Sequence, residues 1–322
     1  MLKLVDKLQE RFDTAMANVF TLSPTEICNY KCFYCFNKSA PPPLPNTKIA
    51  PPQEIVKSVD SLSNCVFVNL SGGGEPMLYP DTLEISNMLV EHGHWLGIST
   101  NFAIHDWAKY LEHIPPENVV LISASYHSPS EETAPLKKQF FHKAQWTRDH
   151  GYNTSIKYIA HPRRIRSGQL QKSQEEFRRA GFRMLILPYR GPYEGKSYPA
   201  AFTDKEREII LDGMDRPFLF DPSTTFKGRV CDSGCRMGWI YRHRTPHVVR
   251  CWYGESLGTI GDVQWQKTPQ TCTTDVCPSR IYMREIGMIQ GEPDLRYYFW
   301  RDRHLNNHET LNWLSKKHGI GS

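Results

Sequence analysis

The segment Val19–Asn37, VFTLSPTEICNYKCFYCFN, places three cysteines shortly after an apolar run. The run Val19–Leu22 has the composition of a buried β-strand. Cys28, Cys32 and Cys35 lie within eight residues of one another, too close for cysteines scattered through a core. Thiolates suit a soft metal centre, and an iron–sulfur cubane usually takes four of them. Three cysteines would therefore leave one iron atom without a protein ligand, as a catalytic metal site does for its substrate.

Further apolar runs alternate with helical patterns after this first strand. The runs are Val66–Leu70, Leu96–Ser99, Val119–Ser123, Ser155–Ile159 and Met184–Leu187. The helical patterns are Pro52–Leu62, Asp81–His92, His105–His113, Glu131–His150, Gly168–Ala180 and Asp204–Asp212. Six βα units in succession predict an α/β fold with a parallel sheet and right-handed crossovers. A closed eight-unit barrel needs about 250 residues. The region 18–215 is shorter, which favours a partial (βα)6 TIM-like barrel.

Composition indicates a globular chain without disulfides or membrane spans. The chain has 322 residues, a formal net charge of +5 and 39% hydrophobic residues. A chain this long buries roughly three quarters of its unfolded surface, so its nine cysteines are not needed as disulfides. No apolar run approaches the ~20 residues that span a bilayer, and the charged N-terminus lacks the pattern of a signal peptide. We therefore expect a cytoplasmic protein with reduced thiols and no membrane contact.

Patterning divides the chain into four parts. Residues 1–17 have the apolar spacing of an N-terminal amphipathic helix, and residues 18–222 hold the βα units. Residues 223–282 contain five cysteines and no βα alternation, which indicates a second, smaller domain. Residues 283–322 are rich in aromatic and charged side chains and predict a helical tail packed on the body.

The first cysteine group resembles a known family signature. Its CxxxCxΦC pattern, with Tyr34 as the aromatic residue, resembles that of radical S-adenosylmethionine (SAM) enzymes. In that family the amino and carboxylate groups of SAM chelate the open iron of a [4Fe–4S] cluster. Ser71–Pro76, SGGGEP, resembles the GGEP motif, whose backbone polar groups hold the SAM amino group. The resemblance thus implies SAM-binding roles for Tyr34, Gly73, Gly74, Glu75 and Pro76, and glycines allow such close approach.

The ends of later strands carry further matches. Ser99 and Asn101 end the third strand, where the family has a TNG-like segment near the SAM ribose; here Phe102 replaces the glycine. Ser125 ends the fourth strand, where a polar ribose contact is common in the family.

Two more matches concern the fifth and sixth strands. Lys157 lies in the fifth, where some members place a basic residue facing the SAM carboxylate. Pro188 ends the sixth, near the expected adenine edge. Apart from Lys157, these residues lie at the carboxyl ends of strands, where parallel barrels assemble active sites.

The second cysteine group comprises Cys231, Cys235, Cys251, Cys272 and Cys277. The text around it resembles the SPASM or twitch extension of some radical SAM enzymes, in which two cysteines flank a β-hairpin and an LGNI-like phrase follows. Here that phrase is Leu257–Ile260, and Pro246 stands where the family has a glycine. Four thiolates suffice for one [4Fe–4S] cluster, so we expect a single auxiliary cluster and one spare cysteine. Cys231 and Cys235 fit the start of the hairpin equally well. A four-cysteine zinc site is the alternative. Cys65 belongs to neither group, and we expect it to be a core residue.

A basic stretch leaves a choice between a solvated helix face and an anionic partner. His161–Arg190 carries seven Arg and one Lys against two Glu. The cations Arg242, His243, Arg244 and Arg250 would also suit phosphates.

The family resemblance implies a reaction. A radical SAM enzyme cleaves SAM reductively and uses the 5′-deoxyadenosyl radical to abstract a hydrogen atom from its substrate, with electrons from a donor such as flavodoxin or ferredoxin. An auxiliary cluster would aid substrate oxidation or binding. The SPASM resemblance favours a peptide residue as substrate. A small molecule, a nucleotide or a nucleic-acid base is the alternative, and a non-catalytic zinc-binding interaction protein is a third hypothesis.

Overall fold

The computed structural model of the chain describes residues 15, 17–35, 49–127, 134–182, 184–212, 226–242, 245–251, 254–275 and 277. The expected C-terminal helical tail lies outside these residues, and so does the N-terminal helix apart from Ala15 and Ala17. Within the described part of the chain, no helix is long and apolar enough to cross a membrane.

Six parallel strands follow one another across the centre of the sheet. They are β1 (Val19–Ser23), β2 (Phe67–Leu70), β3 (Trp95–Thr100), β4 (Val119–Ser125), β5 (Thr154–Ala160) and β6 (Met184–Pro188). Each coincides with an apolar run of the sequence, and consecutive strands pair in parallel. All residues of β1 and β4 are buried, as expected for strands covered on both faces. The prediction of an α/β fold with a parallel sheet is confirmed.

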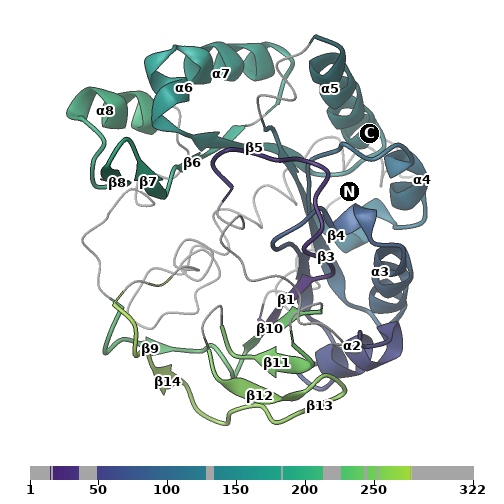
Figure 1. Cartoon of the computed structure of the whole chain (residues 1–322). Helices are drawn as coiled ribbons and strands as arrows, with labels where there is room; N and C mark the ends of the chain where they lie inside the picture. The colour runs from purple at the N-terminus through teal and green to yellow at the C-terminus, as the bar shows by residue number, and fades with distance from the viewer. Residues whose placement is uncertain are drawn as a thin grey trace, which may run out of the picture.

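Helices connect these strands and cover one side of the sheet. They are α2 (Pro52–Asp60), α3 (Asp81–Glu91), α4 (Trp107–Glu112), α5 (Ala134–Asp149), α6 (Pro162–Arg166), α7 (Gln169–Arg179) and α8 (Asp204–Asp212), with 3-10 turns η2 (Pro76–Leu78) and η3 (Pro116–Asn118). The sheet curves, and α2 to α7 lie along its outer side (Figure 1). Gly151 and Gly181 follow α5 and α7 with φ of +85° and +76°, so each ends its helix in the left-handed conformation that glycine adopts without strain.

The sequence did not indicate two elements after β5 and β6. The short helix α6 precedes α7, and a hairpin of β7 (Gly191–Tyr193) and β8 (Lys196–Tyr198) precedes α8. Glu194 and Gly195 form its turn with φ of +49° and +70°, the backbone that a tight two-residue hairpin turn requires.

The cysteine-rich segment adds four of its six described strands to the same sheet. Its elements are β9 (Val230–Cys231), β10 (Met237–Tyr241), β11 (His247–Val249), β12 (Ser256–Thr259), β13 (Asp262–Val263) and β14 (Gln270–Thr271). Strands β10 to β13 join that sheet, and β9 and β14 pair with each other. Strand β10 pairs in parallel with β1, with Met237 opposite Val19 and Tyr241 opposite Ser23. The sheet therefore has ten strands in the order β13-β12-β11-β10-β1-β2-β3-β4-β5-β6 (Figure 1). The expected hairpin is present as β10 and β11.

Arg242 fixes this extension to the helices. The residue is buried, and its Nε and Nη2 donate to the carbonyl oxygen of Ala50 at 2.9 and 2.7 Å. Its Nη2 also forms an ion pair with Asp81 at 2.8 Å. Arg242 thus holds the end of β10 near α2 and α3 and is not presented to a phosphate as the sequence suggested. His243 and Arg244 lie outside the described residues.

Candidate active site

The first cysteine group lies on the loop that follows β1. Cys28 is exposed, Cys32 is buried and Cys35 is partly buried, and none of the three forms a disulfide. The backbone N–H of Cys35 donates to the carbonyl oxygen of Cys32 at 3.1 Å, which turns the chain between them. The backbone N–H of Tyr30 donates to the Cys28 sulfur at 3.4 Å, and the amide of Asn101 donates to it at 3.7 Å. Such hydrogen bonds orient a thiolate toward a metal.

The glycine-rich segment after β2 packs against this cysteine loop. A Cβ at Gly74 would lie 2.8 Å from the carbonyl oxygen of Thr25 and closer still to that of Ile27. The backbone N–H of Glu75 donates to the carbonyl oxygen of Ile27 at 2.9 Å. The motif predicts that its glycines allow a ligand to approach the backbone closely. At Gly74, however, the missing side chain leaves room for the cysteine loop. The two segments are therefore held together by backbone contact.

Glu75 and Asn101 join the glycine-rich segment to the end of β3. Glu75 is buried, and its carboxylate accepts from the Thr100 hydroxyl at 2.8 Å and from the Asn101 backbone at 2.6 Å. Burial raises the pKa of Glu75 to about 7. The Asn101 side chain donates to Asn29 at 2.9 Å and accepts from the backbone of Ala103 at 2.7 Å. These bonds position the loop, and the SAM contacts expected of Glu75 and Asn101 remain predictions.

Phe102 adopts the backbone conformation of the glycine that it replaces. Its φ is +57°, in the left-handed region that costs a residue with a side chain roughly 1 kcal/mol. The ring is buried against Trp107 and Phe140, and the Lys143 ammonium donates to the carbonyl oxygen of Phe102 at 2.6 Å. Packing thus compensates for the strain, and the chain keeps a TNG-like turn without the glycine.

Polar side chains from the ends of β3, β4 and β5 gather near the cysteine loop. The Tyr34 hydroxyl lies 3.0 Å from Nδ1 of His127, and Lys157 donates to the Ser99 hydroxyl at 3.4 Å. Ser125 pairs with Lys157 in the register of β4 and β5. Burial, together with neighbouring cations, lowers the pKa of His127 to about 3, so the ring is neutral at physiological pH.

Pro188, Pro76 and Gly73 complete the predicted set. Pro188 ends β6 beside Ala160 in the register of β5 and β6. Pro76 begins η2 directly after Glu75, and Gly73 precedes Gly74 in the packed segment. All of these residues lie at the carboxyl edge of the parallel sheet, but the structure does not test their contacts with SAM.

Two residues near this edge escaped the sequence interpretation. Arg164 and His161 belong to the basic stretch, which indicated only a helix face or an anionic surface. The His161 ring instead lies 4.7 Å from the Phe33 ring and 6.1 Å from the Tyr34 ring, between centroids. The Arg164 guanidinium lies 4.8 Å from the Tyr34 ring. The signal that could have found them is their position just after β5, the criterion that selected the other residues.

The second cysteine group is partly brought together. Strand β9 pairs with β14, and the backbone N–H of Cys272 donates to the carbonyl oxygen of Arg229 at 2.8 Å, which places Cys272 beside Cys231. A hydrogen bond from Ser233 to the carbonyl oxygen of Arg250 brings the chain next to Cys251 against the same turn. Burial raises the pKa of Cys231 to about 11, and the thiolates of Cys251 and Cys272 contribute by repulsion.

Cys235 and Cys277 complete that group in the sequence. Cys235 lies in the turn before β10, where its pKa is raised by burial and by Asp232 but not by another thiol. Cys277 is partly buried. None of the five cysteines of the group forms a disulfide.

The described residues contain no group of three His, Cys, Asp or Glu side chains around a single point that could hold one metal ion. A cubane cluster requires a different arrangement of ligands. Each cysteine binds a different iron atom, so the sulfurs need not all lie around one metal ion. The donor set after β1 meets it: three cysteines that form no disulfide lie on one loop, and the Cys28 sulfur accepts hydrogen bonds from two N–H groups. These residues fit a cluster with three protein ligands.

Comparison with known proteins agrees with this arrangement. The family model for the radical SAM superfamily matches residues 22–164. Residues 22–164 therefore resemble a radical SAM domain. The match contains the first cysteine group, the glycine-rich segment and Lys157, whereas Pro188 and the second cysteine group lie beyond it. A search of curated proteins gave no match.

Solved structures resemble the chain beyond the radical SAM domain. The structure of anSMEcpe with bound AdoMet is 17% identical, with a TM-score of 0.51, covering 89% of this chain and 84% of that one. The same protein with AdoMet and the Kp18Cys peptide gives the same identity and score, covering 89% and 83%. Streptococcus suis SuiB bound to precursor peptide SuiA is 13% identical, with a TM-score of 0.54, covering 82% and 68%. Likeness at these identities shows a shared fold.

Proposed function

We propose that the protein is a radical SAM enzyme that acts on a peptide and carries one auxiliary [4Fe–4S] cluster. The observation that supports it most is the locked arrangement of three segments at one edge of the sheet. The loop with Cys28, Cys32 and Cys35 is fixed by Gly74 and Glu75 from the next strand and by Asn101 from the third. A turn that only connects a strand to a helix does not need three segments joined around three cysteines.

In this proposal the three thiolates bind three iron atoms and leave the fourth open for SAM. When bound, the cluster and SAM supply the hard chemistry: one electron from a flavodoxin, ferredoxin or chemical reductant yields methionine and a 5′-deoxyadenosyl radical, which takes a hydrogen atom from the substrate. The chain's own residues hold and orient these groups. Gly73 and Pro76 belong to the segment that would hold the SAM amino group, Lys157 would face the SAM carboxylate, and Ser99 and Ser125 would lie near the ribose. Tyr34 would line the SAM site, and Pro188 would lie near the adenine.

The auxiliary cluster is assigned to Cys231, Cys251 and Cys272, with Cys277 as the fourth ligand. Neighbouring strands and the Ser233–Arg250 contact support the first three. Cys235 becomes the spare cysteine, because no thiol of the group contributes to the shift of its pKa. The proposal thus favours Cys231 over Cys235, a choice that the sequence left open.

The proposal of a peptide substrate rests on the fold neighbours, two of which were solved with peptides bound. The phosphate-binding alternative loses support from the basic residues. Arg166, Arg178 and Arg179 form ion pairs with glutamates, and Arg242 is buried. These cations are therefore committed to the protein itself.

Anaerobic purification with iron–sulfur reconstitution tests the proposed function. Two [4Fe–4S] clusters require about eight irons per chain, and dithionite with SAM should release 5′-deoxyadenosine. Stoichiometric zinc without iron would overturn the enzyme assignment in favour of a zinc-binding interaction protein. Eight irons without SAM cleavage would overturn the radical reaction alone.

Cys32→Ala separates the two clusters. We expect loss of SAM cleavage and retention of about four irons with the absorption of the second cluster. Cys65→Ala is the matched control, because Cys65 donates to the carbonyl oxygen of Gly93 at 3.5 Å, away from both groups. SAM cleavage unchanged in Cys32→Ala would contradict the assignment.

A further inference from the structure

Arg164 is a buried cation without a hydrogen-bond acceptor. Its side chain is 2% exposed, and none of Nε, Nη1 and Nη2 donates to any residue that the structure describes. Burying a charged donor without a partner costs several kcal/mol in general. Such a group in a native fold calls for an acceptor that the described residues do not supply.

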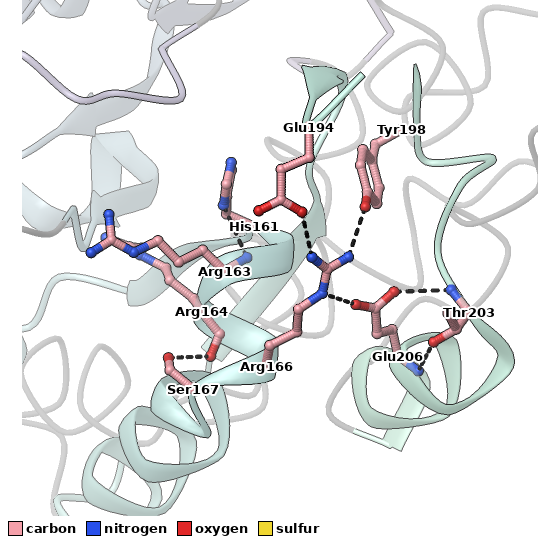
Figure 2. Close-up of polar contacts among 9 residues, drawn as sticks. All are labelled: His161, Arg163, Arg164, Arg166, Ser167, Glu194, Tyr198, Thr203 and Glu206. Carbon is pink, nitrogen blue, oxygen red and sulfur yellow. Dashed lines mark hydrogen bonds and ion pairs between the residues drawn. The ribbon is translucent and has the colours of Figure 1, made fainter. Parts of the chain in front are cut away.

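Arg166, two residues further along the same helix, differs from Arg164 because each of its three side-chain nitrogens has a hydrogen-bond acceptor. Its Nε donates to Glu206 at 2.7 Å, its Nη1 to Glu194 at 2.8 Å and its Nη2 to Tyr198 at 2.9 Å. Figure 2 shows Arg166 directed toward these partners and Arg164 extending to the other side of the helix. The described residues therefore supply acceptors to all three donor nitrogens of Arg166 and to none of those of Arg164.

Two tyrosine rings hold the Arg164 guanidinium in place. Its Cζ lies 4.8 Å from the centre of the Tyr34 ring and 4.9 Å from that of Tyr158. Stacking on rings orients a guanidinium and leaves its N–H edge free to form a planar pair with a carboxylate. Tyr34 belongs to the cysteine loop, so the guanidinium stands at the candidate active site.

The neighbours of Arg164 carry positive charge or none. Lys157 and Arg164 both act on His127, which is neutral at physiological pH. His161 is neutral as well, and Arg163 and Arg166 lie near it. Within the described residues no carboxylate forms an ion pair with Arg164. An anion that binds there therefore meets a positive charge that no carboxylate neutralises.

We propose that Arg164 binds a carboxylate of the peptide substrate, so that the enzyme prefers a substrate with an acidic residue or terminus near the reacting site. This inference rests on the proposed function, which assigns the SAM carboxylate to Lys157. Arg164 is then a second cation for a second anion. The other source of the same chemistry is the SAM carboxylate itself, and the experiment separates the two.

The test uses the full-length, anaerobically reconstituted protein loaded with SAM. The probes are the peptides acetyl-Gly-Glu-Gly-amide and acetyl-Gly-Gln-Gly-amide, which differ in one charge. We expect the wild type to bind the Glu peptide about tenfold more tightly, as a charge-assisted hydrogen bond predicts, and Arg164→Met to bind both equally. Arg163→Met is the matched control: it removes an adjacent but exposed arginine and should keep the tenfold preference. Equal binding by the wild type, or a preference kept in Arg164→Met, would overturn the proposal.

A second arm compares SAM with decarboxylated SAM. If Arg164→Met removes the preference for SAM, the residue holds the SAM carboxylate and the proposal is wrong. Arg164→Lys covers the case in which Arg164→Met does not fold: it keeps the charge without the planar fork, and its preference for the Glu peptide should be reduced but present. An Arg164-dependent preference in a protein that takes up no iron would support this site and overturn the proposed function instead.

Discussion

Gly74 shows how a single residue can determine the geometry of the cysteine loop. A side chain there meets the backbone at Thr25 and Ile27 and not a flexible neighbour. The contact can be relieved only if the loop moves, and that loop carries the three proposed iron ligands.

Gly74→Ala is therefore expected to lower SAM cleavage far more than stability. Relief of the contact displaces the loop by about 1 Å, and misplacement on that scale costs about 100-fold in rate. The measurement is 5′-deoxyadenosine release with iron content determined in parallel. Gly168→Ala is the control for activity: its Cβ meets nothing within 4 Å, and its left-handed φ of +72° should cost only about 1 kcal/mol of stability away from the cysteine loop. Equal activities for the two variants would contradict the role given to Gly74.

His161 makes the stability of the protein depend on pH. Burial, with Arg164 and two other arginines nearby, lowers the pKa of His161 to about 4 from 6.5. Its Nδ1 accepts from the backbone N–H of Arg163 at 3.2 Å, which requires this nitrogen to be unprotonated.

Between pH 6.5 and 4 the unfolded chain binds a proton at His161 that the folded chain does not. Acidification through this window should lower the free energy of unfolding, by at most about 1.4 kcal/mol per pH unit. His161→Asn keeps a helix-capping acceptor and removes the titration, so its urea midpoints should fall less between pH 6.5 and 4.5. Parallel pH profiles for the two proteins would exclude His161 as the source.

At the scale of elements, Arg166 joins α6 to the β7–β8 hairpin and α8. Glu194 belongs to the hairpin turn, Tyr198 to β8 and Glu206 to α8 (Figure 2). Glu206 is almost fully buried, and it also accepts from the backbone N–H of Thr203 at 2.9 Å. The Arg166 side chain thus fixes the β7–β8 hairpin and α8, two elements with few neighbouring strands to pair with.

Arg166→Met should lower the free energy of unfolding by about 1–3 kcal/mol, because the buried Glu206 loses its charged partner. The control is Arg178→Met, which breaks an exposed pair with Glu175 and should cost at most about 0.5 kcal/mol. Urea unfolding of both variants measures the difference. Equal midpoints would show that the Arg166 contacts add no stability.

Across the whole molecule, the strands and helices of the βα region were predictable because each is a local pattern. The runs at Val66–Leu70 and Val119–Ser123 needed only apolar, β-branched residues, and glycines after α5 and α7 ended the helices. The cysteine loop and glycine-rich segment followed from their position after strands.

What escaped the sequence depends on contacts between distant residues. The parallel pairing of β10 with β1 joins positions more than 200 residues apart, so no local pattern indicates it. Burial of Arg164 results from stacking with Tyr34 and Tyr158, and composition shows only another arginine in a basic stretch. The left-handed Phe102 is favoured by its packing, not by its intrinsic preference.

Because the two regions share one sheet, we expect the βα region to aggregate when the cysteine-rich segment is removed. Removing residues 226–322 would unpair one side of β1, a fully buried strand with the sequence VFTLS. An exposed apolar edge strand pairs with other chains, so residues 1–225 should form aggregates in light scattering where the full chain does not. A soluble monomer with the full chain's circular dichroism per βα residue would contradict this.

The direction of β10 also sets the spacing between the two cysteine groups. Because β10 runs parallel to β1, the turn between Cys231 and β10 lies at the amino end of β1, where the carbonyl oxygen of Arg236 accepts from the N–H of Val19 at 2.8 Å. Cys28 follows the opposite end. A strand of five residues rises about 13 Å between its first and last Cα atoms. Electrons passing between two such centres would cross a rigid, hydrogen-bonded ladder of fixed length, so their transfer rate would depend on the sheet and little on loop motion.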